Sequence, residues 1–313
     1  MDKITIVGAG RVGESTAQIL AQRGLCKVLA LVDIKEGAAA GAALDIQEAA
    51  PLFGYDTRLI GDTDASIMAG SGLVIITAGI PRKPGMSRSD VLGTNIGILD
   101  KIMDDVMQYA PDSKVILVSN PVDTLTYYAW KKSGWDRSRV FGQAGVLDSS
   151  RMAAFVSLET GYSVKNISAM VLGGHGDAMV PMTRFTTISG IPIEHFVDEK
   201  TIEKIVKRSR FGGAEILALK KNSSAYNAPA AAIAEMVEAI VLDRRHVLPA
   251  VAILQGEYGE RDLAMGVPCV LAEQGMDKVI ELPLNDAEKT MFDETIMNIK
   301  NDLDRISNLK MND

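Results

Sequence analysis

One histidine of this sequence lies in a turn of small residues, where few neighbouring side chains can shield it. The chain has only three histidines, and His175 stands in the stretch LGGHGDAMVP, with a glycine on each side and Asp177 close behind. Imidazole has a pKa of about 6.5, so it can accept or donate a proton near neutral pH. His195 and His246 have bulky or charged neighbours and no partner motif, so we expect surface or packing roles for them. His175 is therefore the candidate proton-transfer residue.

A carboxylate and a guanidinium that could serve this histidine occur together in the stretch GVLDSSRM. Asp148 and Arg151 are three positions apart at the start of a predicted helix, so both side chains lie on one face of its first turn. A carboxylate can fix the imidazole tautomer, and the planar fork of arginine suits a substrate carboxylate. The same spacing is also typical of an ordinary ion pair or helix cap, and both interpretations stay open.

A cationic loop follows the predicted strand that ends at Thr77. Its sequence, AGIPRKPGMSRSDVLG, combines glycines and prolines with Arg82, Lys83 and Arg88. The loop leaves the carboxyl edge of the predicted sheet, where ligands of such folds bind, so we expect a lid that closes on an anion. Each of these residues by itself is also typical of a solvated surface loop.

An asparagine follows the next predicted strand at the same edge of the sheet. In VILVSNPVD, Asn120 precedes Pro121, which favours a fixed turn and allows a cis peptide bond. The amide could hold a substrate hydroxyl and the nicotinamide side of a cofactor, or it could simply end the strand.

The first predicted strand runs directly into a glycine-rich turn. GAGRVG places Gly8, Gly10 and Gly13 at the GxGxxG positions as a helix begins, with Ala9, Arg11 and Val12 between them. This arrangement gives a tight turn, close approach of the backbone to a pyrophosphate, and a helix N-terminus that attracts it. The next strand ends in LVDI, where Asp33 can bind the adenosine ribose hydroxyls and repel a 2′-phosphate. We predict NAD rather than NADP as the cofactor; a purely structural turn and strand cap would show the same residues.

The elements that must position these groups alternate in the first half of the chain. β-branched runs at residues 4–7, 28–32, 73–77 and 115–118 are separated by helical patterns at 12–23, 38–49 and 89–109. This order predicts an α/β fold with a Rossmann-type doubly wound parallel sheet. After about residue 142 we expect helices at 148–160, 202–221, 228–244 and 286–310 and strands near 167–172, 186–188, 247–254 and 267–271. We therefore predict an NAD-binding domain at 1–143 and an α+β substrate-binding, catalytic domain at 144–313.

Composition excludes several classes of partner. The chain has 313 residues, 47% of them hydrophobic, and a formal net charge of −7, which argues against nucleic acid or an anionic membrane as the main partner. Cys26 and Cys269 show no CxxC spacing, so we expect neither a disulfide framework nor a metal site. We see no signal peptide and no apolar run of about 18 residues that could span a membrane. These features predict a cytoplasmic protein.

Six motifs in order, GAGRVG, LVDI, GIPRKPGMSR, VSNPVD, GVLDSSR and GGHGDAMVP, resemble the lactate and malate dehydrogenase family. Within this family, the chain is most similar to the subgroup of lactate-dehydrogenase-like malate dehydrogenases. The resemblance implies that His175 is the proton donor and acceptor, oriented by Asp148, and that Arg151 binds the C1 carboxylate of the substrate. It also implies that Arg88 polarises the reacting carbonyl and that Asn120 binds the substrate oxygen. The cofactor residues that it adds are Asn95, Val118, Ser119 and Asn120.

The residue at position 82 bears on the substrate. In the resembling family a neutral residue at this lid position goes with lactate, whereas arginine goes with malate. Closing over the methyl group of pyruvate would leave the Arg82 guanidinium buried and unpaired, at a cost of about 3 to 5 kcal/mol. That cost corresponds to roughly two to three and a half decades of discrimination. We therefore expect the dicarboxylates malate and oxaloacetate as substrates.

The motifs do not determine every residue of the substrate pocket, the substrate that the enzyme prefers, or the number of subunits. In KKNSSAYNAPAAA, Ser223 and Asn227 depart from the family pattern near the pocket, where Ser224 is a further candidate. An L-lactate dehydrogenase and a non-catalytic NAD-binding regulatory protein are the competing functions. The resemblance also implies a homodimer or homotetramer, in which the apolar helices at 40–49 and 228–242 could form subunit contacts.

Overall fold

The computed structural model of the chain describes residues 1–80, 88–176 and 178–310. Six parallel strands form the sheet of the first half, in the order β3-β2-β1-β4-β5-β6. Four of them coincide with the predicted β-branched runs, which confirms the doubly wound sheet. The strands are β1 (Lys3–Val7), β2 (Val28–Val32), β3 (Arg58–Asp62), β4 (Leu73–Ile76), β5 (Lys114–Leu117) and β6 (Val140–Gly142).

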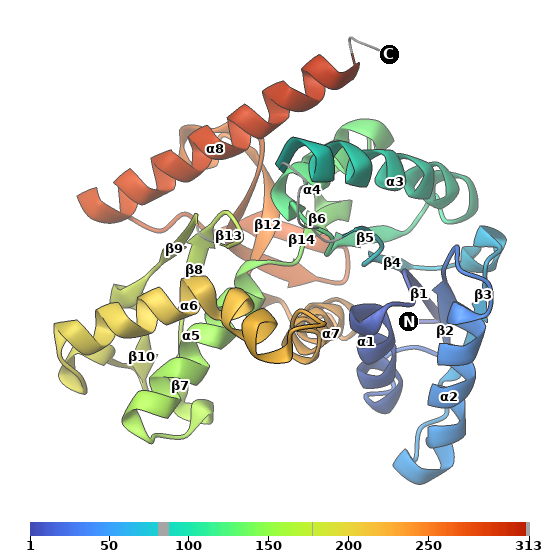
Figure 1. The fold of residues 1–313 in the computed structure, drawn as a ribbon, viewed down its shortest axis with the longest axis horizontal. Coiled ribbons are helices and arrows are strands. Elements are labelled where there is room, and N and C mark those ends of the chain that lie inside the picture. The colour runs from blue at the N-terminus through green and yellow to red at the C-terminus, as the bar shows by residue number, and fades with distance from the viewer. Residues whose placement is uncertain (81–87, 177, 311–313) are drawn as a thin grey trace.

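Helices cover both faces of this sheet (Figure 1). Ile4 and Ile6 of β1 belong to the same buried cluster as α1 (Arg11–Gln22) and α2 (Ala38–Phe53). Val7 points to the opposite face, where it joins the cluster of α3 (Arg88–Tyr109) and α4 (Val122–Ser133). Because neighbouring side chains of a strand alternate between faces, a strand covered on both sides reads as a continuous apolar run.

The second half extends the sheet with antiparallel strands. The long strands β12 (His246–Gln255) and β13 (Arg261–Ala272) form a hairpin, and Val251 of β12 pairs with Gly142 of β6. The described residues thus contain one sheet of eleven strands that runs through both halves. Its other strands are β8 (Val171–Gly173), β9 (Met179–Pro181) and β14 (Gly275–Val279).

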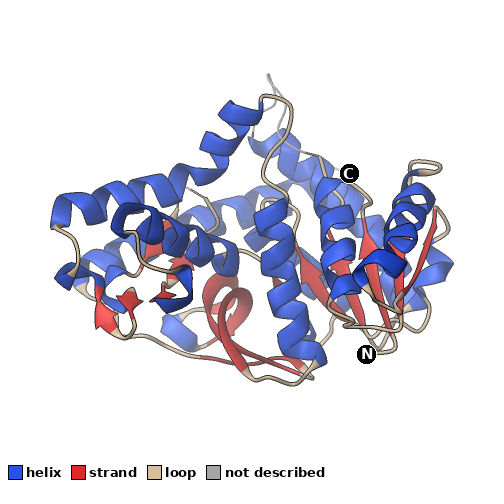
Figure 2. Cartoon of the chain, turned by 90° about the horizontal axis from the view of Figure 1, so that it is seen from below, coloured by secondary structure: helices blue, strands red, loops and turns tan. Residues whose placement is uncertain are grey.

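A three-stranded sheet lies apart from the main one. It is formed by β7 (Ile167–Ser168), β10 (Thr187–Ile188) and β11 (Ile191–Pro192). The single strand predicted near residues 167–172 is therefore wrong, because the chain changes sheets between β7 and β8. Helices lie around the strands of both halves (Figure 2).

The remaining helices confirm the predicted order. They are α5 (Gly145–Thr160), α6 (Glu199–Lys220), α7 (Asn227–Val241) and α8 (Asp286–Lys310). Short 3₁₀ turns occupy Ala65–Met68, Arg137–Arg139, Val164–Asn166, Thr183–Phe185, Ile193–His195 and Glu257–Gly259. In the described part of the chain, no helix combines the length and apolarity that a membrane span requires.

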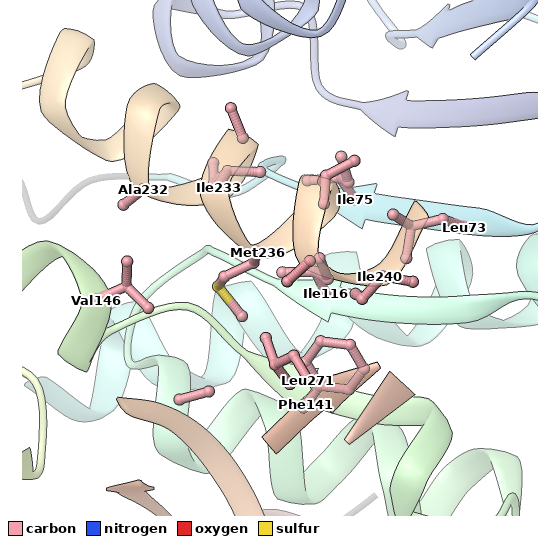
Figure 3. Close-up of a cluster of buried hydrophobic side chains, with 14 of the residues drawn as sticks. Leu73, Ile75, Ile116, Phe141, Val146, Ala232, Ile233, Met236, Ile240 and Leu271 are labelled. Carbon is pink, nitrogen blue, oxygen red and sulfur yellow. The ribbon is translucent and has the colours of Figure 1, made fainter. Parts of the chain in front are cut away.

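Helix α7 joins the two halves of the chain. Its Ile233, Met236 and Ile240 share one buried cluster with Ile75 of β4 and Ile116 of β5 (Figure 3). Each of these α7 side chains is fully buried. Because burial of such side chains stabilises by about 1.5 to 3 kcal/mol each, the contact fixes the second half against the parallel sheet.

Candidate active site

His175 lies in the turn between β8 and β9. Gly173 and Gly176 have φ angles of +82° and +96°, the left-handed region in which an L side chain is strained. These glycines let the chain reverse within a few residues while the imidazole, 21% exposed, lines a cavity of about 510 Å³. The structure therefore gives a backbone reason for the glycines around this histidine.

Asp148 holds the imidazole from the first turn of α5. The Asp148 side chain is 2% exposed, and its Oδ2 lies 2.9 Å from Nδ1 of His175. Burial lowers the pKa of His175, but the Coulombic attraction and hydrogen bond of Asp148 outweigh it, so the pKa lies above its ordinary value. An imidazole held in this way at Nδ1 has its other nitrogen free for a substrate.

Arg151 binds the other oxygen of the same carboxylate. Its Nη1 donates to Oδ1 of Asp148 at 3.1 Å, so the i,i+3 spacing forms the ordinary ion pair that the sequence left open as an alternative. The guanidinium lies against Gly212 and Gly213 of α6, where Nη2 is 3.8 Å from a Cβ built at Gly213. Its buried Nε has no hydrogen-bond partner among the described residues, and the side chain does not line the cavity. Binding of a substrate carboxylate by Arg151 remains a prediction.

Asn120 and Asn95 meet at the carboxyl edge of the sheet. Asn120 lines the cavity, and its peptide bond to Pro121 is cis. Asn95 is 2% exposed; its Nδ2 donates to the carbonyls of Asn120 at 2.7 Å and Ile80 at 3.2 Å. Its Oδ1 accepts from the N–H of Ile80 at 2.8 Å. Asn95 thus ties the segments after β4 and β5 together, and a direct contact with the cofactor remains a prediction.

The glycine-rich turn fits the predicted dinucleotide. A Cβ at Gly13 would lie 1.9 Å from the carbonyl oxygen of Gly8, and Gly8 itself has a φ of +105°, so internal packing requires both. A Cβ at Gly10 would meet no described heavy atom within 4 Å. Packing leaves Gly10 unexplained, whereas close approach of a pyrophosphate would account for it. Asp33 lies beside this turn, and its Oδ2 accepts from the N–H of Ala9 at 2.8 Å.

The other predicted cofactor residues surround this edge. Arg11 is exposed, with its guanidinium 5.6 Å from the ring centroid of Tyr226 at the start of α7, and Val12 packs against the core. Val118 is half-buried, and the hydroxyl of Ser119 donates to the carbonyl of Ala78.

Several predicted residues cannot be placed in the same way. Arg82 and Asp177 lie outside the described residues, and of Arg88 only the backbone, at the first position of α3, is described. Ser224 is exposed between α6 and α7 and does not line the cavity.

The cavity also has walls that the sequence did not indicate. Helix α8 contributes Glu294, Thr295 and Asp302, α6 contributes Arg210, and α4 contributes Asp123. Asp123 belongs to the VSNPVD motif, so an acid in the first turn after a strand was the available signal. Its desolvation on burial raises the pKa of the carboxyl to about 6.

Comparison with known proteins assigns the class. Residues 2–142 match the family model for the NAD binding domain of lactate/malate dehydrogenase, and residues 145–310 match its alpha/beta C-terminal domain. The chain belongs to the lactate/malate dehydrogenase family of NAD-dependent oxidoreductases.

Individual relatives within this family include both malate and lactate dehydrogenases. A malate dehydrogenase of Thioalkalivibrio sulfidiphilus is 66% identical over 98% of this chain and 100% of its own length. The malate dehydrogenase structure from Salinibacter ruber has a TM-score of 0.95 at 40% identity, covering 99% of each chain. A Cryptosporidium parvum lactate dehydrogenase, solved with lactic acid and the dinucleotide, has a TM-score of 0.94 at 36% identity and covers 98% of each chain. The fold alone therefore does not separate the two activities.

Proposed function

We propose that this chain is a malate dehydrogenase, which catalyses the reversible NAD-dependent oxidation of (S)-malate to oxaloacetate. The observation that carries the proposal is the hydrogen-bonded pair of His175 and Asp148 at the wall of the cavity. A protein that only binds a dinucleotide has no need of a proton-transfer pair. The high identity to a malate dehydrogenase over the whole chain supports the substrate.

The residues act on the proton and the carboxylate groups of the substrate. Bound NAD would supply the hydride acceptor for C2 of malate, and the glycine-rich turn with Asp33 would hold it. His175 takes the hydroxyl proton, and Asp148 stabilises the imidazolium that forms. Arg151 is proposed to bind the C1 carboxylate, and Asn120 the substrate oxygen. In the reverse direction His175 returns the proton to the carbonyl oxygen of oxaloacetate.

The choice of malate over lactate is proposed to depend on Arg82. Its guanidinium pairs with the second carboxylate of oxaloacetate, whereas pyruvate offers only a methyl group there. Arg88 is proposed to polarise the reacting carbonyl. Both roles rest on the sequence motif and on the names of the relatives.

The test is the decrease in NADH absorbance with oxaloacetate and, separately, with pyruvate. We expect rapid oxidation of NADH with oxaloacetate and slow oxidation with pyruvate. Preference for pyruvate would instead indicate a lactate dehydrogenase, and no turnover with either substrate a regulatory protein.

We further propose a homodimer or homotetramer that works in the cytoplasm. Large apolar side chains are exposed on α2, where Leu52 is 87% and Phe53 59% exposed, and burial in a subunit contact would remove them from water. Two free cysteines suit a reducing compartment. Light scattering at several concentrations tests the assembly, and a monomer at micromolar concentration would contradict it.

The division into domains at 1–143 and 144–313 is likewise proposed. The matched ranges of the two family models, which end at residue 142 and begin again at residue 145, support it.

A further inference from the structure

Asp123 is a buried acid next to the catalytic histidine, and the proposed mechanism does not use it. It lies in the first turn of α4, is 7% exposed and lines the cavity. Its Oδ1 is buried and has no hydrogen-bond partner among the described residues. A buried carboxylate that is only partly hydrogen-bonded is costly, so its presence beside a reaction site points to a role there.

The other oxygen of Asp123 holds the backbone of His175. Oδ2 accepts from the main-chain N–H of His175 at 3.3 Å. Gly174, the residue before His175, packs between α4 and α8: a Cβ there would lie 3.6 Å from the same oxygen, an ordinary contact, and 3.2 Å from Cγ2 of Thr295, which is tight. His175 is thus held twice, with Asp148 on its ring and Asp123 on its main chain.

The charged groups around Asp123 come from four elements. His175 belongs to the β8–β9 turn, Asp148 and Arg151 to α5, and the cavity is also lined by Arg210 of α6 and by Glu294 and Asp302 of α8. Of these, His175 is the group in direct hydrogen-bond contact with Asp123. A negative charge at Asp123 favours the protonated imidazole, as does the charge of Asp148.

We propose that Asp123 is a positioning residue for proton transfer, whose carboxylate fixes the main chain of His175 and places a negative charge beside the imidazole. This role rests on the proposed malate dehydrogenase reaction. The coupling itself is a property of the folded protein and is measurable without a substrate.

The first experiment is an NMR titration of the three histidines in protein labelled at histidine, with the His175 signal assigned from a His175→Asn sample. Asp123→Asn keeps an oxygen that can accept from the N–H of His175 but removes the charge. We expect the pKa of His175 to fall by about one unit, as a Coulombic interaction in a partly shielded site predicts. His195 and His246 serve as internal controls and should not move. A His175 pKa within about 0.2 units of the wild-type value would overturn the proposal.

The second experiment measures kcat/KM for oxaloacetate against pH. In Asp123→Asn the fall in rate at rising pH should move down by about one unit, because reduction requires protonated His175. Asp123→Leu, which also removes the hydrogen-bond acceptor, should lower kcat by about tenfold or more. An unchanged pH profile in Asp123→Asn contradicts the proposal. Asp123→Ser is a second neutral variant if the asparagine protein does not fold.

The two experiments separate the proposals. If wild-type protein does not reduce oxaloacetate, the proposed function fails, while the titration of His175 still tests Asp123. If the enzyme is active but its histidine is insensitive to Asp123→Asn, only the role of Asp123 fails.

Discussion

The contacts of Asp148 define a sharp mutational test of the site. Its two oxygens face two donors, Nδ1 of His175 at 2.9 Å and Nη1 of Arg151 at 3.1 Å. Asparagine has nearly the same shape but only one acceptor oxygen, so Asp148→Asn must turn its NH₂ group towards one of these donors. The variant therefore loses the negative charge, and its NH₂ group faces the N–H donor of either His175 or Arg151 in a buried site.

The magnitude of the effect on kcat follows from the burial of the Asp148 side chain, which is 2% exposed. Removing one partner of a buried charged pair costs about 3 to 5 kcal/mol. If the imidazolium bears this cost, kcat for oxaloacetate reduction falls by roughly two to three and a half decades. The pKa of His175 also falls, because burial, which lowers it, is no longer outweighed by Asp148.

The assay is the initial rate of NADH oxidation at saturating NADH, measured between about pH 5 and pH 9. The rate should decline with rising pH from a lower pH than in the wild type, since fewer molecules then carry the imidazolium. Asp56→Asn, which changes an exposed carboxylate away from the cavity, is the control. A variant within about threefold of wild-type kcat and with the same pH profile would refute the orienting role of Asp148.

Three further predictions concern specificity, the cofactor and stability. Arg82→Gln should lower kcat/KM for oxaloacetate at least about a hundredfold and raise it for pyruvate; unchanged selectivity would contradict the substrate assignment. Gly10→Ala should weaken NADH binding in a fluorescence titration but leave Tm unchanged, because the protein has room for the methyl group. Gly13→Ala should weaken NADH binding and also lower Tm, because its methyl group would collide with the carbonyl oxygen of Gly8. Asp123→Asn should raise the free energy of unfolding by up to about 3 kcal/mol at pH 8, because the pKa of about 6 means that the folded state penalises the ionised form. This gain must shrink at pH 5, where Asp123 is mostly protonated, and an equal gain at both pH values in denaturant unfolding would exclude the mechanism.

The sequence predicted those helices and strands whose burial requires a regular pattern of apolar residues. The bounds of β2 and α8 agree with the predicted ranges, since one is an apolar run and the other a long amphipathic pattern. The strands β3 and β6 were missed. RLIGD is an edge strand with a mixed pattern, and VFG is too short to show a period. Such strands form because neighbouring strands pair with them, which is not visible locally.

The site was predictable to the extent that side chains bind side chains within known motifs. Asp148 and His175 were paired through the family resemblance, and the structure places them in contact. The position of Asp123 in the VSNPVD motif indicated an acid near the site but not its contact with His175, because its partner is a main-chain N–H that any residue at position 175 other than proline would offer. The contribution of α8 to the cavity depends on long-range packing, which spacing along the chain does not encode.

His175 is expected to transfer the proton in this dehydrogenase, and the variant His175→Asn removes that imidazole alone. The measurement is kcat for oxaloacetate reduction, together with the Kd for NADH by fluorescence titration. The Kd should stay within about twofold, because the glycine-rich turn and Asp33 are untouched. We expect kcat to fall by several decades, since asparagine cannot carry the proton. A His175→Asn enzyme with near wild-type kcat would contradict the mechanism.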